Sequence, residues 1–287
     1  MTGAGRRPAR PTGLWPEGIS CAVAFTFDFD AEEVWLADDP ANAGRLGVLS
    51  QGAYGAKVGV PLVLDVLTRH RVPGTFFVPG RVAERHPHQV RAIVAAGHEL
   101  GHHGYTHRSP TTLAPEEEER ELVGGREALE RFAHVSGYRS PSWDISDATL
   151  ALLRKHGFAY SSNLMDDIKP YRHEHAGLVE LPVHWLLDDA AHFWFAGDTW
   201  EKKIATITEV EELWRGELAG ICELGGCCVF TMHPQLIGRP SRLRLLETMI
   251  GLARATPGVW IAPAGEVAAH VASTPADASP AATRRES

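Results

Sequence analysis

The segment GHELGHHGYTH, from Gly97 to His107, contains four closely spaced histidines. Neutral imidazole is the commonest metal ligand in proteins, so the cluster predicts a metal site. Two pairs have a suitable spacing. His98 and His102 form the HExxH pattern of zinc proteases, and His103 and His107 form an HxxxH pair.

The expected backbone of this segment favours the second pair. A protease pattern must lie on a helix, so that its histidines share one face. Here the preceding helix is expected to end at Gly97. If HELGH is extended instead, its histidines lie roughly 13 Å apart, too far to share a zinc ion. A single helical turn over 103–107 would bring His103 and His107 together. The protease pattern stays as the second hypothesis.

Two acidic residues that could complete the site follow the first apolar run of the chain. Asp28 and Asp30 alternate with phenylalanines in FTFDFDAEE. In a strand, this period of two places both carboxylates on one face, with Cα atoms roughly 6–7 Å apart. Two buried carboxylates without a cation would be costly. One could bind a metal while the other acts as a base, unless the strand end is exposed and both are solvated.

Together with two later motifs, these residues resemble the polysaccharide deacetylase family, carbohydrate esterase family four. The four motifs are TFDFD at 26–30, HGYTH at 103–107, RSPSW at 139–143 and FTMHP at 230–234. The first has the DxD form in place of the common TFDD. The second has Gly104 where Ser or Thr is usual. The resemblance covers about residues 20–270 and rests on the order and spacing of the motifs.

The resemblance implies a metal site with three ligands from this chain. Asp30, His103 and His107 are the implied ligands, and they leave a position open for water and substrate. Zn²⁺ is the expected metal, while Co²⁺, Mn²⁺ and Fe²⁺ are alternatives that such ligands also accept.

The resemblance also implies the catalytic groups of a metal-assisted amide hydrolase. Asp28 is the implied general base, and Arg139 would pair with it and favour its ionised form. His233 is the implied general acid, and the backbone N–H of Ser142 is the implied oxyanion donor. The simpler interpretations are a surface ion pair for Arg139 and a packed strand-end histidine for His233.

The substrate is left open between two classes. The DxD motif and the segments Glu180–Asp189 and His233–Arg242 resemble a subgroup containing cyclic imide hydrolases and allantoinase-like proteins. That likeness implies a small cyclic amide or imide, in place of an N-acetylated sugar, and a homo-oligomer, often a tetramer. No acid is assigned to His233. A metal-bearing but inactive binding module is a third hypothesis.

Four residues are expected to contact substrate, namely Trp35, Trp143, Trp185 and Arg239. The alternative is that they belong to the core, an interface or a loop.

Apolar strands alternate with amphipathic helices along the chain, which predicts parallel strands joined by crossovers. The expected fold is α/β, a distorted (β/α) barrel of about seven parallel strands with the motifs at strand ends. The expected organisation is an arm at 1–18, a single catalytic domain at 19–272 and a disordered tail at 273–287. The segment Glu33–Lys57 is expected to be a long loop.

Composition excludes several other classes of protein. The net charge of −8, without a long basic run, argues against a nucleic-acid partner. The N-terminal arginines precede no apolar signal region, and no membrane span is expected. The four cysteines match no metal pattern and are interpreted as reduced core thiols, so a cytoplasmic location is expected.

Overall fold

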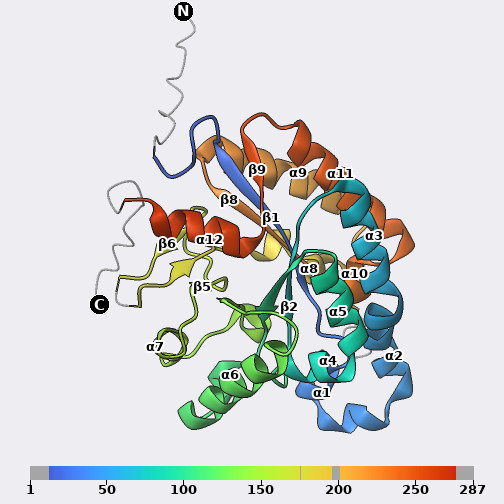
Figure 1. Ribbon diagram of the computed structural model, residues 1–287. Helices are drawn as coiled ribbons and strands as arrows, with labels where there is room; N and C mark the ends of the chain where they lie inside the picture. The colour runs from blue at the N-terminus through green and yellow to red at the C-terminus, as the bar shows by residue number, and fades with distance from the viewer. Residues whose placement is uncertain (1–12, 175, 196–200, 276–287) are drawn as a thin grey trace, which may run out of the picture.

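Strand β1 (Cys21–Asp28) pairs with three other strands in the computed structural model, which describes residues 13–174, 176–195 and 201–275 (Figure 1). All its residues are buried, as expected for a parallel strand covered on both faces. Strand β8 (Cys227–Met232) pairs along one side of β1. Strands β2 (Thr75–Val78) and β9 (Val259–Ile261) share the other side.

The remaining strands extend the sheet beyond β2. In chain order they are β3 (Glu99–His102), β4 (Gly137–Tyr138), β5 (Tyr160–Ser161), β6 (Tyr171–Arg172) and β7 (Val179–Glu180). The spatial order is β6-β7-β5-β4-β3-β2-β1-β8. All neighbouring strands are parallel except the pair β6 and β7, which the sequence pattern did not predict. The mostly parallel strands curl into a half-barrel, which confirms the predicted fold class.

Alternate residues of β1 face two different layers. Cys21, Val23 and Phe25 contact the helices outside the sheet. Ala22 and Ala24 face the barrel interior, together with side chains of the last helix.

The α-helices are α1 (Glu33–Asp38), α2 (Leu46–Tyr54), α3 (Val60–His70), α4 (Gly80–Arg85), α5 (Pro87–Ala95), α6 (Pro115–Leu129), α7 (Thr149–Lys155), α8 (Asp189–Phe193), α9 (Ile207–Leu224), α10 (Pro234–Ile237), α11 (Pro240–Ala255) and α12 (Ala264–Ser273).

The segment predicted to be a long loop is mostly helical, so that prediction was wrong. It contains α1, a 3-10 helix (Pro40–Gly44), α2 and the start of a π-helix (Gly55–Gly59). Glycine weakens an isolated helix, which obscured the pattern. Here it permits close packing instead. A Cβ atom on Gly52 would lie 2.3 Å from the carbonyl oxygen of Ala31, and one on Gly59 would lie 2.1 Å from that of Pro234.

Parts of both predicted terminal segments lie outside the described residues, namely 1–12 and 276–287. Within the described part of the predicted arm, Leu14 is buried and Trp15 Nε1 donates a hydrogen bond to the Gly225 carbonyl, at 2.9 Å. Over the described ranges, no helix has the length and apolar character needed to cross a membrane.

Candidate active site

In the HExxH pattern, His98 lies directly before β3 and His102 is the last residue of that strand. The two histidines do not form a metal site. The segment is extended up to His102, as the sequence predicted. His98 Nδ1 accepts a hydrogen bond from the Gly74 N–H at 3.1 Å. His102 Nδ1 accepts one from the Gly104 N–H at 3.0 Å, so its Nε2–H donates to the Leu122 carbonyl, also at 3.0 Å. These bonds give the two imidazoles structural roles, and the geometry does not support the protease hypothesis.

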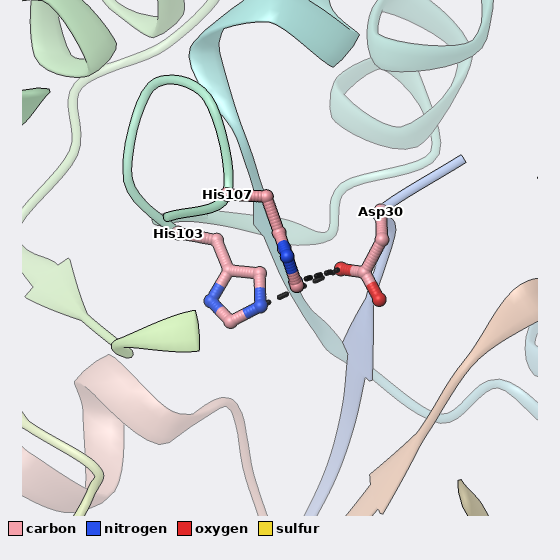
Figure 2. Close-up of side chains that lie close together, drawn as sticks. All are labelled: Asp30, His103 and His107. Carbon is pink, nitrogen blue, oxygen red and sulfur yellow. Dashed lines mark ion pairs between the residues drawn. The ribbon is translucent and has the colours of Figure 1, made fainter. Parts of the chain in front are cut away.

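The next two histidines do converge on Asp30, as Figure 2 shows. Asp30 Oδ1 lies 3.4 Å from His103 Nε2 and 3.6 Å from His107 Nε2. One ligand atom from each residue lies within 4.8 Å of the others. His103 Nδ1 donates to the carbonyl of Arg139 at 2.8 Å, which leaves Nε2 free to bind a metal.

The backbone that joins the two histidines is a bend and not the predicted helical turn. Gly104 has a φ of 74° and His107 a φ of 60°, both in the left-handed region. Glycine adopts this conformation without steric cost, whereas His107 is held there by its surroundings. The two imidazoles lie close together, as the sequence predicted, but the predicted local conformation was wrong.

Charge and burial at these three residues suit a cation. Asp30 Oδ1 is buried and has no hydrogen-bond partner among the described residues. Burial raises the pKa of Asp30 to about 8, although the charge of His233 opposes the rise. Burial also lowers the pKa of His103 and of His107, which keeps both imidazoles neutral, as metal ligands must be. A divalent cation would stabilise the ionised form of Asp30.

Asp28 lies beside this cluster and is paired with a buried arginine. Arg139 Nη1 donates to Asp28 Oδ1 and to Thr26 Oγ1, both at 2.8 Å. Burial alone would raise the pKa of Asp28. The charges of Arg139, His103 and His233 outweigh that effect and lower it. Asp28 is therefore ionised, and its Oδ2 is 4.0 Å from His103 Nε2.

His233 approaches the cluster from the end of β8. Its Nε2 lies 3.7 Å from Asp30 Oδ2, and its Nδ1–H donates to Asp189 Oδ1 at 2.7 Å. Burial would lower the pKa of His233, but the hydrogen bond and charge of Asp189, with the charge of Asp188, raise it well above the ordinary value. Asp189 is thus the acid that the sequence left unassigned. The adjacent acidic pair Asp188 and Asp189, at the start of α8, was its only signal.

The motif RSPSW forms a strained turn beside the histidines. Ser142 and Trp143 have φ values of 60° and 56°, in the left-handed region. Such strain in residues other than glycine clusters at functional sites. The Ser140 N–H donates to Asn163 Oδ1 at 2.7 Å, which fixes the start of the turn.

Comparison with known proteins identifies the family of this chain. The family model described as polysaccharide deacetylase matches residues 52–161. A peptidoglycan deacetylase of Helicobacter pylori is 29% identical over 276 residues, which cover 83% of this chain and 92% of that protein. The solved structure of a putative polysaccharide deacetylase from Mycobacterium smegmatis is 46% identical, covers 92% of this chain and 94% of that one, and superposes with a TM-score of 0.87. The chain belongs to the polysaccharide deacetylase family.

The fold of this polysaccharide deacetylase family member is shared more widely. A solved structure of Puue allantoinase superposes with a TM-score of 0.78 over 93% of this chain and 95% of that one. Its sequence identity is 21%, so this likeness concerns the fold.

The structure places one of the four residues expected to contact substrate in a cleft and the other three outside its described lining. A cleft of about 850 Å³ opens beside His107 and Ser142, and Trp35 lines it, stacked on Trp194 with ring centroids 4.9 Å apart. The other three do not belong to the described lining of this cleft. Trp143 and Trp185 contact each other at 4.5 Å between ring centroids, and Arg239 lies over the ring of Tyr54 at 4.5 Å.

Proposed function

We propose that this protein is a metal-dependent hydrolase of carbon–nitrogen bonds other than peptide bonds. Its proposed substrate is an N-acetylated sugar or a small cyclic amide or imide. The observation that carries the proposal is the convergence of Asp30, His103 and His107 between two further groups. An ionised Asp28 lies on one side and a protonated His233 on the other. The deacetylase named among the relatives supports the same reaction class.

Asp30, His103 and His107 would hold one divalent cation, for which we propose Zn²⁺. Three protein ligands with an open position are typical of catalytic zinc. When bound, the cation would polarise the substrate carbonyl and activate water. The buried, unpaired Asp30 Oδ1 and the two neutral imidazoles fit this role.

Asp28 would be the general base. Its carboxylate is kept ionised by Arg139 and lies next to His103, so it can take a proton from the attacking water. The water oxygen then forms a bond to the carbonyl carbon. The Ser142 backbone N–H lies in the strained turn beside the same cleft and would donate to the developing oxyanion.

His233 would be the general acid. Asp189 holds its Nδ1–H, which fixes the ring and favours the imidazolium form. Nε2 faces the cluster and would give its proton to the leaving nitrogen as the C–N bond breaks. The products are a carboxylate and an amine. Asp28 and His233 thus act with opposite protonation states because their charged neighbours differ.

The test is hydrolysis by protein that has been reconstituted with Zn²⁺. The substrates are N-acetylated sugars on one side and succinimide, hydantoin, dihydrouracil and allantoin on the other. Release of acetate supports a deacetylase, whereas ring opening without acetate supports a cyclic amidase. Asp28→Asn should lower turnover at least about 100-fold while zinc binding persists. Full turnover by Asp28→Asn, or no hydrolysis of any of these compounds, would contradict the proposal.

A further inference from the structure

Glu121 is a partly buried acidic residue of α6 for which the proposed reaction has no role. Its carboxylate contacts the bend between the two histidines of the proposed metal site. Oε2 accepts hydrogen bonds from the backbone N–H groups of Tyr105, at 3.0 Å, and Thr106, at 2.7 Å. Oε1 accepts one from the Thr106 hydroxyl, also at 2.7 Å. One side chain thus makes three hydrogen bonds to two consecutive residues, which lie directly between Gly104 and His107.

The carbonyl groups of the same bend are bound by the start of α4. The Gly80 N–H donates to the carbonyl of Gly104, and the Arg81 N–H donates to that of Tyr105, both at 3.0 Å. These donors are available because the first N–H groups of a helix have no partner within it. The bend therefore has its carbonyls bound to backbone and its N–H groups bound to Glu121. Only the bonds of Glu121 can be removed by substituting a side chain.

The position of Glu121 is set by the packing of α6 against this bend. Gly125 follows Glu121 by about one helical turn. A Cβ atom on Gly125 would lie 2.7 Å from the Gly104 carbonyl oxygen, so glycine is what lets the helix approach so closely. The carboxylate is thus carried to the bend by a helix of the fold and not by the histidines themselves.

The bend needs this support because its conformation is unfavourable for one of the histidines. His107 has a φ of 60°, in the left-handed region. A residue other than glycine stays in that region only where surrounding contacts outweigh the steric cost. Glu121 binds the two residues that directly precede His107. In this conformation the imidazole of His107 lies 5.0 Å from that of His103, measured between ring centroids.

We propose that Glu121 is a positioning residue for the metal ligands His103 and His107, because it fixes the bend that brings their imidazoles together before the metal binds. The inference rests on the proposed function, since it needs both histidines to be ligands. The three hydrogen bonds of Glu121 are directed at the bend, so it acts through the histidines and not on the metal. A site whose ligands are already in place binds more tightly, because less conformational freedom is lost on binding.

The test is Zn²⁺ affinity, measured by competition with a chromophoric chelator, in variants of the full chain. Glu121→Met removes the three hydrogen bonds and should weaken Zn²⁺ binding by about 10- to 100-fold. Glu121→Gln removes the charge but keeps a carbonyl oxygen that can accept from both N–H groups, so its affinity should stay close to that of the unmodified protein. Glu127→Met makes the same change at an exposed position of α6 and should leave the affinity unchanged. The melting temperature of each metal-free variant reports separately on folding.

The outcomes separate this inference from the proposed function. If Glu121→Met lowers the melting temperature but binds zinc as tightly as the unmodified protein, Glu121 is only a structural residue and the inference is overturned. Equal weakening by Glu121→Met and Glu121→Gln would also overturn it, because the charge and not the hydrogen bonds would then be responsible. If Asp30→Ala binds zinc as tightly as the unmodified protein, the metal site itself is wrong, and the proposed function fails with it. If Glu121→Met does not fold, Glu121→Asp decides the matter, since it keeps the charge, shortens the reach and should also weaken binding.

Discussion

At the scale of single residues, the ion pair of Asp28 and Arg139 is the place where a mutation should have the largest effect. Arg139 is fully buried, donates to Asp28, Thr26 and Ser162, and lies over the ring of Phe77 at 4.2 Å. Its positive charge is needed to keep Asp28 ionised inside the protein. The pair therefore links stability to the base of the proposed reaction.

Arg139→Met should lower the free energy of unfolding by about 3–5 kcal/mol, because it leaves the Asp28 carboxylate buried without its partner. Adding Asp28→Asn to this variant should restore part of the loss. Urea unfolding followed by circular dichroism measures both. Arg69→Met is the matched control, since Arg69 forms its ion pairs at the surface and its loss should change stability far less. Equal losses for the two single variants would contradict the assignment of Arg139.

The residues of the proposed metal site could be identified from the sequence, but the residue that supports the proposed acid could not. Asp30, His103 and His107 lie in short motifs whose spacing and residue types indicate a metal site by themselves. Asp189 meets His233 across 44 positions of the chain. This contact follows no local period, so only the folded arrangement reveals it.

At the scale of elements, the helical segment after β1 determines how tightly the site loops are held. α2 contacts the turn that follows Asp30, because Gly52 has no side chain at the point of contact. The π-helix contacts the start of α10 through Gly55 and Gly59. One continuous helical element thus supports both the loop that carries the proposed metal ligand Asp30 and the loop that carries the proposed acid His233.

Two glycines of α2 should respond oppositely to the same change. Gly52→Ala should destabilise the protein by about 1–3 kcal/mol, because the added methyl group would collide with the Ala31 carbonyl. Gly47→Ala should stabilise it by about 0.4–1 kcal/mol, because an added Cβ atom there meets no described atom within 4 Å. Thermal unfolding of the two variants tests this difference. Stabilisation by Gly52→Ala would show that α2 does not approach the loop so closely.

The strands were predictable where an apolar run was long enough to show its period. β1 and β8 are such runs, and the extended form of HELGH followed from the helix stop at Gly97. The helices between Glu33 and Gly59 were not predictable, because glycine-rich helices are stabilised by the surface they contact and not by their own propensity.

At the scale of the whole molecule, α12 closes the end of the half-barrel opposite the site. The Ala264 N–H donates to Thr75 Oγ1 at 2.8 Å, and the Gly265 N–H donates to Glu99 Oε2 at 2.9 Å. Glu99 also accepts from Thr75 Oγ1 and from the Tyr160 hydroxyl. The first residues of β2, β3 and β5 are therefore joined to the last helix through one carboxylate.

This connection predicts a specific dependence of stability on pH. Burial raises the pKa of Glu99 above its ordinary value of 4.5 in the folded protein. Glu99 therefore binds its proton more tightly in the folded state than in the unfolded state. Its contribution to stability is present below its ordinary pKa and is lost as pH rises through its pKa in the folded state. Glu99→Gln removes this titration. The free energy of unfolding of the unmodified protein should therefore fall, relative to that of Glu99→Gln, as pH rises above the ordinary pKa of 4.5. Parallel stability curves from chemical unfolding would contradict it.

The central claim is that one divalent cation binds between Asp30, His103 and His107. Anomalous diffraction at the zinc edge, from crystals grown with Zn²⁺, tests it most directly. We predict a single strong peak about 2.0–2.2 Å from Asp30 Oδ1 and from the Nε2 atoms of both histidines. A peak between His98 and His102, or a bound ion that Asp30 does not contact, would contradict the account.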